Sequence, residues 1–255
     1  MDKRIDSLDC CKLLIAIFVV AIHTFPLENS EQNFLLRTAV PFFFTVSGYF
    51  YFRKWAVQPT LGLGCYLNKI VHLYLFWTIM YIPLAVYDFY CGDKTLFDNL
   101  LSFIKDLVFT GQHFYSWPLW YLLSLIYMLP IAYFCWVRVK NKYIQMMLFM
   151  LVILVYFLLY HMSTNFSSYG ICGRLLEVTL FNGRLFSTYI YLSVAYFLSK
   201  KDVPSLRVSF GGLVAVLFLN YLLPSMNATV YNIIITMMRM VFVYSLFSLC
   251  LFFFK

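Results

Sequence analysis

LDCCKLLIAIFVVAIHTF, residues 8–25, is the stretch that decides the fold. Between Leu13 and Ile22 it contains only apolar residues. At a rise of about 1.5 Å per residue, a helix of this length crosses most of the roughly 30 Å hydrocarbon core of a bilayer. The stretch therefore predicts a transmembrane helix with ionisable side chains near both of its ends.

Similar apolar runs fill most of the remaining chain. They lie at residues 35–52, 68–87, 116–137, 143–161, 184–199, 208–224 and 230–254. The 255 residues are 63% hydrophobic and 12% charged, whereas soluble domains are about half apolar and a quarter charged. A soluble fold could not cover this surplus, so we expect one all-α membrane domain over residues 1–255, a bundle of about eight transmembrane helices in the plasma membrane.

The charges predict how the helices are oriented. Basic residues gather in every second connection, at Lys3, Arg4, Arg53, Lys54, Lys69, Arg138, Lys140, Lys142, Lys200, Lys201, Arg207 and Lys255. Because cytoplasmic loops carry the excess of lysine and arginine, this alternation places both termini in the cytoplasm. The net charge of +8 then reflects topology, and we expect no nucleic-acid partner. Residues 13–22 could also be the apolar core of a cleaved signal peptide. They are followed by His23-Thr24-Phe25-Pro26 and no small-residue cleavage site, so we expect the first helix to be retained.

The segment TLFDNLLSFIKDLVFT, residues 95–110, has a different pattern. Its apolar residues recur with i, i+3, i+4 spacing, and polar residues lie opposite them. This pattern predicts an amphipathic helix that lies on the outer membrane interface and ends near Gly111. Packing of the same helix on the bundle is the alternative. The seven cysteines form no C-x-x-C pair, so neither a metal site nor a disulfide framework is expected.

Ionisable residues within a membrane helix mark function by default. Lys12 and His23 are eleven residues apart, about three turns, so they share one face of the first helix about 16 Å apart along its axis. Asp9 lies one turn before Lys12, close enough to pair with it. Arg239, in the middle of the last run, should face the bundle. Alternatively, Lys12 and His23 lie in the two headgroup regions.

Five stretches together resemble the acyltransferase family 3 membrane proteins, which include O-acetyltransferases of bacterial cell-surface glycans. DCCK at 9–12, ten residues and then His23 is similar to the family pattern D-x-x-R, ten residues, His. The others are AVPFFFTVSGYF (39–50), KIVHLYLFW (69–77), PLWYL (118–122) with Trp120, and more weakly FNGRLF (181–186). Within the family, the chain resembles the membrane half of the vancomycin-resistance serine racemases.

Three departures from the family pattern are visible. Lys12 replaces an arginine, which keeps the charge but loses the planar fork that grips phosphate. Lys69 and His72 replace an arginine pair. The eight runs are two fewer than the ten helices usual in the family, so the last two family helices are expected to be missing.

The resemblance implies a membrane-bound O-acyltransferase that moves an acyl group, expected to be acetyl, from cytoplasmic acyl-CoA to a hydroxyl of an extracytoplasmic glycan or peptidoglycan-type acceptor. It implies acyl-CoA as the donor and no metal. Lys12, Lys69 and His72 would bind the CoA head, and His23 would be the catalytic base. Supporting residues would be Asp9, Ser47, Gly48, Trp120 and Arg239, of which Ser47 and Gly48 would let the second helix approach the first.

Two alternatives remain open at this point. Lys12, His23 and Arg239 could instead line the path of a small-solute transporter, although no inverted repeat of interrupted helices is evident. The chain could also be an inactive truncated relative. Labelling of envelope glycan that depends on acyl-CoA favours the enzyme, and solute flux without CoA favours the transporter.

Overall fold

The computed structural model describes residues 6–24, 30–57, 62–92, 95–111, 118–163, 184–200, 205–222 and 228–252. Within these ranges the chain is helical and contains no β-strand, in agreement with the predicted all-α class. The chain forms two compact units. The first unit comprises Met1–Ala56 and Ile190–Lys255, and the second unit comprises Val57–Tyr189.

Over its described residues, each of the eight predicted apolar runs is helical, apart from a turn within the run at 35–52 and a turn residue, Pro118, at the start of the run at 116–137. The helices are α1 (Asp6–Thr24), α3 (Ala39–Val57), α4 (Leu63–Cys91), α6 (Leu119–Tyr133) with its π-helical continuation η2 (Phe134–Arg138), α7 (Lys142–Ser163), α9 (Arg184–Lys200), α10 (Leu206–Leu222) and α11 (Ala228–Phe252). Within the described ranges, three segments are long and apolar enough to cross a membrane, namely Leu63–Cys91, Leu119–Arg138 and Ile234–Phe252. These segments support a helical membrane protein, and the count of eight crossings stays a prediction.

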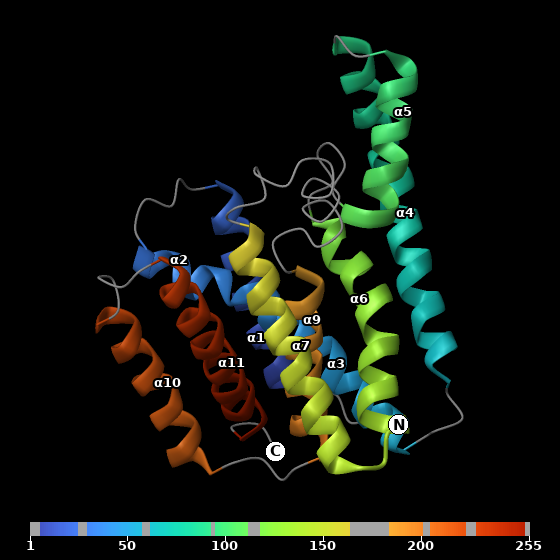
Figure 1. Cartoon of the computed structure of the whole chain (residues 1–255). Helices are drawn as coiled ribbons and strands as arrows, with labels where there is room; N and C mark the ends of the chain where they lie inside the picture. Colours follow the sequence, from blue (N-terminus) through green and yellow to red (C-terminus); the bar gives the residue numbers. More distant parts are fainter. Residues whose placement is uncertain are drawn as a thin grey trace. The chain divides into compact units, whose positions relative to one another are not determined.

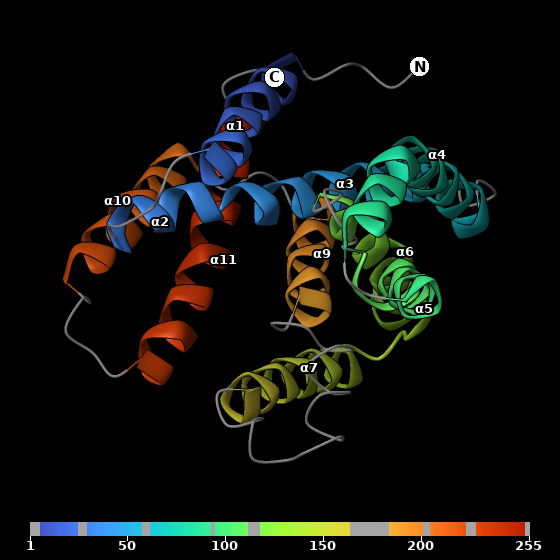
Figure 2. The same ribbon diagram turned by 90° about the horizontal axis from the view of Figure 1, so that it is seen from above.

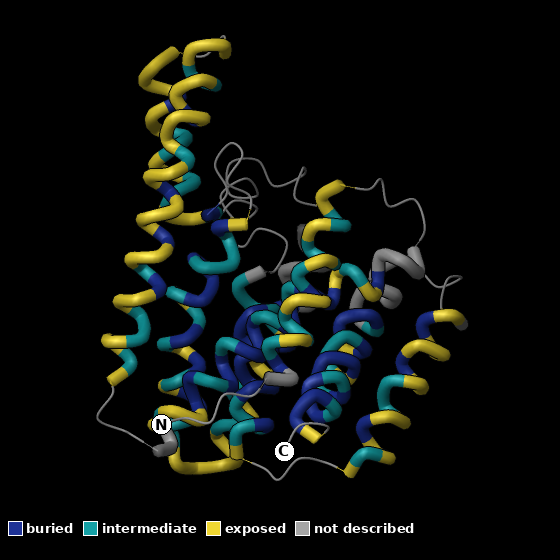
Figure 3. The backbone as a smooth tube through the Cα atoms, turned by 180° about the vertical axis from the view of Figure 1, so that it is seen from behind, coloured by how far each residue is buried: buried dark blue, intermediate teal, exposed yellow. Residues whose placement is uncertain are grey.

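The core of the first unit lies along α11. Helices α10 and α11 run side by side (Figure 1), and α11 carries fully buried side chains such as Val243 and Phe247. The ring of Phe247 lies 6.0 Å from that of Phe42 and 4.9 Å from that of Tyr49, both on α3. These aromatic contacts hold α3 against α11, and Figure 3 shows the burial along the backbone of this part of the chain.

The second predicted run is interrupted by a break that the hydropathy pattern does not reveal. The expected span at 35–52 is divided into the short helix α2 (Ser30–Arg37) and α3, with a turn at Thr38 between them (Figure 2). Pro41 explains the break, because its missing N–H cannot bond the carbonyl of Arg37 and is tolerated only in the first turn of a helix. Thr38 closes the end of α2 by donating its own N–H to the carbonyl of Leu35 at 3.1 Å.

Gly48 allows a close helix approach, but its partner differs from the one predicted. A Cβ atom at Gly48 would lie 2.8 Å from the side chains of both Leu192 and Ala195 on α9. The expectation that Gly48 faces the first helix is therefore wrong. The missing side chain instead lets α3 and α9 pack closely within the first unit, in the small-residue manner of membrane helices.

One sulfur contact shows that α1 and α11 are neighbours within the first unit. The Sγ atoms of Cys11, near the start of α1, and Cys250, near the end of α11, lie 2.7 Å apart. The described part of the chain therefore begins and ends at the same end of the first unit. A topology with both termini on one side of a membrane requires this arrangement.

We expect mild oxidation with diamide to link Cys11 to Cys250 within one chain, because each thiol gives up one electron and one proton to the reagent and the sulfurs are already in contact. Mass spectrometry of unreduced peptides would identify the linked pair. Cys250→Ser should remove the link, and Cys10→Ser, next to Cys11 but exposed, should keep it. A link from Cys250 to any other cysteine would contradict this helix arrangement.

The second unit is built on α4 and α6. Their shared cluster contains Tyr74, Leu119 and Leu123, all buried. At 29 residues, α4 is the longest described helix, and α5 (Leu96–Lys105) folds back against it (Figure 1). The rings of Phe89 and Phe103 lie 6.4 Å apart at this contact.

The segment predicted to be amphipathic is helical and ends as expected. Thr95 caps α5, accepting the N–H of Asp98 at 3.2 Å, and α5 continues as the π-helical turn η1 (Asp106–Thr110). Gly111 ends η1 with a φ of +64°, and a Cβ there would meet the Trp120 backbone at 2.7 Å. The positive φ and this close approach together explain why glycine occupies the position.

The side of α5 that is turned toward the protein contains Asn99 and Phe103, whereas most of the predicted apolar face is exposed, as are Asp98 and Lys105. Asn99 is only 7% exposed, whereas Phe97 and Leu101 are 72% and 58% exposed. The carbonyls of Leu107 and Val108 in η1 accept hydrogen bonds from the hydroxyls of Tyr74 and Tyr127, at 2.7 and 2.6 Å. Tyrosines of α4 and α6 thus fix the helix while most of its large apolar side chains stay uncovered.

Candidate functional site

The polar residues of the first helix form the candidate site in the first unit. The predicted pair is present: Lys12 Nζ lies 2.9 Å from Asp9 Oδ1. Lys12 follows the fully buried Leu8 by four residues and precedes the buried Ile15 by three, so helical spacing places it in the same row as these core residues. The ammonium also lies 4.8 Å from the centre of the Phe50 ring of α3. Its charge is therefore held between a carboxylate and an aromatic face.

His23 lies at the opposite end of α1, in its last turn. Because α1 is one uninterrupted helix, the separation of eleven positions from Lys12 to His23 keeps the two side chains on nearly the same face, about 16 Å apart along the axis. The imidazole is exposed within the first unit. Thr24 beside it donates its hydroxyl to the carbonyl of Val20 at 3.0 Å.

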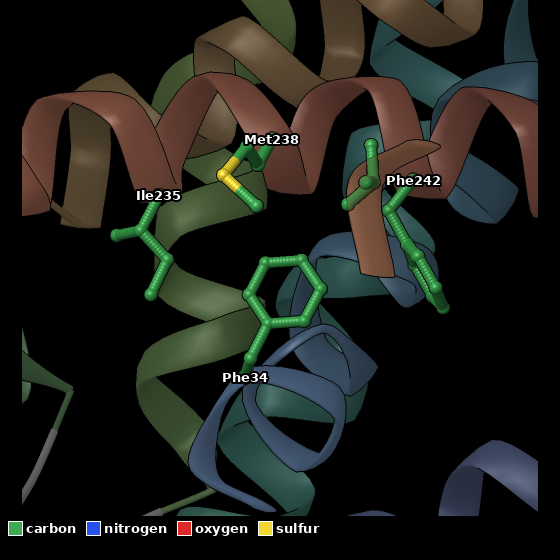
Figure 4. Packing of buried hydrophobic residues seen from close by; sticks show 5 residues of the cluster. Phe34, Ile235, Met238 and Phe242 are labelled. Atoms are coloured by element: carbon green, nitrogen blue, oxygen red, sulfur yellow. The ribbon is translucent and has the colours of Figure 1, made fainter. Parts of the chain in front are cut away.

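Arg239 lies beside a buried aromatic cluster near the middle of α11. Its guanidinium carbon is 5.8 Å from the centre of the Phe34 ring of α2. Phe34 is fully buried and points toward Ile235, Met238 and Phe242 of α11 (Figure 4). The cluster explains how an arginine is placed within an apolar helix, since a cation over an aromatic face is partly compensated for lost water. Arg239, partly buried, thus lies against the Phe34 ring, and its predicted functional role stays a prediction.

Ser47 and Gly48 lie on α3, close to Thr45, whose side chain bonds the helix backbone. Thr45, fully buried, donates its hydroxyl to the carbonyl of Pro41 at 3.0 Å. Such backbone bonds satisfy hydroxyls in apolar surroundings. Ser47 is partly exposed and Gly48 is buried. The packing of Gly48 on α9 gives it a structural role.

The remaining predicted residues belong to the second unit. Lys69 and His72 are exposed on neighbouring turns of the first part of α4, and His72 Nδ1 lies 2.7 Å from the carbonyl oxygen of Asn68. Trp120, in the first turn of α6, is partly exposed. Its backbone lies against Gly111, so the PLWYL motif also anchors the turn that follows η1.

The structure also shows a positively charged side chain, that of Arg53, which is not among the predicted site residues. Arg53, on α3 one turn after Tyr49, donates from Nη1 to the Tyr49 hydroxyl at 3.0 Å. The i, i+4 spacing of Tyr49 and Arg53 is visible in the sequence, but the sequence analysis uses the charge of Arg53 only to orient the helices in the membrane. The described residues contain no cluster of histidine, cysteine and acidic side chains that could hold a metal ion.

These features define a helical protein with candidate membrane-spanning segments and a charged first helix. The family model described as an acyltransferase domain matches residues 5–255. The chain therefore belongs to acyltransferase family 3, in agreement with the resemblance of its motifs, and this membership supports an acyltransferase-type function.

The chain is also similar to parts of larger curated proteins. An amino-acid racemase of Enterococcus faecalis is 32% identical over 140 residues, which cover 52% of this chain and 19% of the racemase. A serine/alanine racemase of Enterococcus gallinarum is 32% identical over 131 residues, covering 47% of this chain and 18% of that protein. The matched segment is thus about a fifth of the length of these relatives. No solved structure matches the chain.

Proposed function

We propose that the chain is a membrane-bound O-acyltransferase. It transfers an acyl group, acetyl in the first instance, from cytoplasmic acyl-CoA to a hydroxyl of an extracytoplasmic glycan or peptidoglycan-type acceptor. The observation that carries the proposal is the first helix of this family member. It holds a cation, paired with Asp9, near one end and an imidazole at the other. A group transfer across a bilayer needs an anion-binding group on the donor side and a base on the acceptor side.

The proposed placement is multi-pass in the plasma membrane, with eight crossings and both termini in the cytoplasm. The alternation of basic residues along the sequence supports it. The contact of Cys11 with Cys250 supports it as well, because it brings the start of α1 and the end of α11 together. The uncovered apolar residues of α5, such as Phe97 and Leu101, fit an interfacial helix at the outer surface.

In the proposed mechanism, Lys12 binds a phosphate of CoA, and Asp9 holds the ammonium in place. The long acyl-bearing arm of CoA then extends along α1 toward His23. The imidazole takes the proton of the acceptor hydroxyl while the hydroxyl oxygen attacks the thioester carbonyl. The carbon–sulfur bond breaks, and the departing thiolate of CoA receives the proton from the imidazolium. This direct transfer needs no acyl-enzyme on Ser47. The resemblance further assigns Lys69 and His72 to donor binding.

Binding of acetyl-CoA to the detergent-purified chain is the first test, because it requires no knowledge of the acceptor. We expect saturable binding measured by calorimetry, and transfer of labelled acetyl to envelope glycan when the chain is present in membranes. Absence of both in a folded protein would overturn the enzyme proposal. Solute flux in vesicles without CoA would then favour the transporter.

A further inference from the structure

We propose that Arg53 is a second phosphate ligand for the acyl donor and that it supplies the planar guanidinium missing at position 12. The proposal rests on the acyl-CoA function proposed above. It names a residue that neither the family motifs nor the polar face of α1 includes. The proposal is based on the contacts between positively charged side chains and aromatic rings at one end of the first unit.

The guanidinium of Arg53 is held in place by the buried Tyr49. Its Nη1 donates to the Tyr49 hydroxyl at 3.0 Å, and its central carbon lies 5.8 Å from the centre of the same ring. Tyr49 is only 6% exposed, and its ring packs 4.9 Å from that of Phe247 on α11. A guanidinium has five N–H donors in one plane. The bond to Tyr49 uses one of them and fixes the orientation of the others.

Arg53 is at the same end of the first unit as Lys12. The Lys12 ammonium lies over the ring of Phe50 at 4.8 Å, and the ring of Phe50 lies 5.8 Å from that of Tyr49. The two cations are thus supported by neighbouring rings of one helix, α3. Lysine offers a point charge and arginine a bidentate fork, so together they provide what a single arginine in the family pattern would offer to a phosphate group.

A third cation is arranged in the same way. Lys200, at the end of α9, lies 5.8 Å from the ring of Tyr196, and that ring packs 5.3 Å from Phe52 of α3. Among the described residues, neither Arg53 nor Lys200 forms an ion pair with a carboxylate, whereas Lys12 is paired with Asp9. This excess of positive charge on three helices favours a ligand with several negative charges. The phosphates of CoA have that character.

The simpler alternative is that Arg53 only fixes the orientation of α3 or binds the phosphate of a lipid headgroup. A matched control separates these roles. Arg207, near the start of α10, is also exposed and also belongs to the predicted cytoplasmic side. Its replacement by glutamine changes the charge by the same amount as Arg53→Gln.

The test is a titration of the purified full chain with acetyl-CoA, and with adenosine 3′,5′-bisphosphate as a probe of the phosphorylated adenosine head without the acyl-bearing arm. Arg53→Gln should weaken both by about 10- to 100-fold, since a charge-assisted hydrogen bond contributes about 1.5–3 kcal/mol. Arg53→Lys should recover part of the affinity, Tyr49→Phe should lose a few-fold, and Arg207→Gln should bind as the unaltered chain does. Size-exclusion profiles would show that each variant is folded.

Equal affinities in Arg53→Gln and Arg207→Gln, with acetyl-CoA bound by the unaltered chain, would overturn this inference and leave the proposed function standing. Unchanged acetyl-CoA binding with weaker retention of phosphatidylglycerol by Arg53→Gln would assign the guanidinium to a lipid phosphate and would overturn it too. No binding by the unaltered chain would overturn both proposals.

Discussion

His23→Ala is expected to lower acyl transfer by about 100- to 10,000-fold, the range that a positioned general base contributes, while binding of acetyl-CoA is retained. The reason lies in the length of α1. His23 is separated from Lys12 by about 16 Å along one helix, so removal of the imidazole leaves the proposed phosphate contact intact. The measurement is transfer of labelled acetyl to envelope glycan in membranes, alongside calorimetric binding to the purified variant.

Two control variants make the result specific to proton transfer. His23→Gln keeps a polar side chain of similar length but cannot accept the proton at neutral pH, so it should be as inactive as His23→Ala. Thr24→Ala removes the neighbouring hydroxyl, which bonds the carbonyl of Val20 within α1, and should leave transfer within a few-fold. Full activity of His23→Ala would show that another group is the base, and equal losses in His23→Ala and Thr24→Ala would indicate a structural effect.

The helices were predictable because their apolar runs are long and their termini are marked by charge. The described residues of each predicted run are helical apart from the turns at Thr38 and Pro118, and the stop at Gly111 follows from its left-handed backbone. The break at Thr38 was missed because the apolar residues of α2 and α3 join without a gap in hydropathy. Pro41 was the available signal, since its missing N–H cannot continue a helix that begins near residue 35.

In the candidate site too, contacts within one helix could be predicted from the sequence, whereas contacts between helices could not. The pair of Asp9 and Lys12 follows from i, i+3 spacing alone and is present at 2.9 Å. The ring of Phe50 over Lys12 joins residues of two helices, and the packing of Gly48 on α9 joins residues far apart in the sequence. Such contacts depend on which helices are neighbours, and helical periodicity contains no information about that choice.

Substitutions of Lys12 should show how strongly the affinity for the acyl donor depends on the charge at this position. Lys12→Met keeps most of the apolar stem and removes the ammonium, so we expect acetyl-CoA binding to weaken by about 10- to 100-fold, the equivalent of one charge-assisted hydrogen bond. Lys12→Arg keeps the charge and adds the planar fork typical of the family, so its affinity should equal or exceed that of the unaltered chain. Calorimetric titration of the three purified proteins would measure the series.

The loss in Lys12→Met has two possible origins, because the ammonium is paired with Asp9. Removal of the cation takes a phosphate ligand away and also leaves an unpaired carboxylate near the ligand, which would repel an anion. Asp9→Asn in the Lys12→Met background separates these effects, because the double variant has no repelling charge. If the double variant recovers full affinity, Lys12 only neutralises Asp9. If it stays at least several-fold weaker than the unaltered chain, the ammonium itself contacts the donor. We expect the second result, since the lysine lies between Asp9 and the Phe50 ring and its remaining N–H donors can reach a phosphate oxygen.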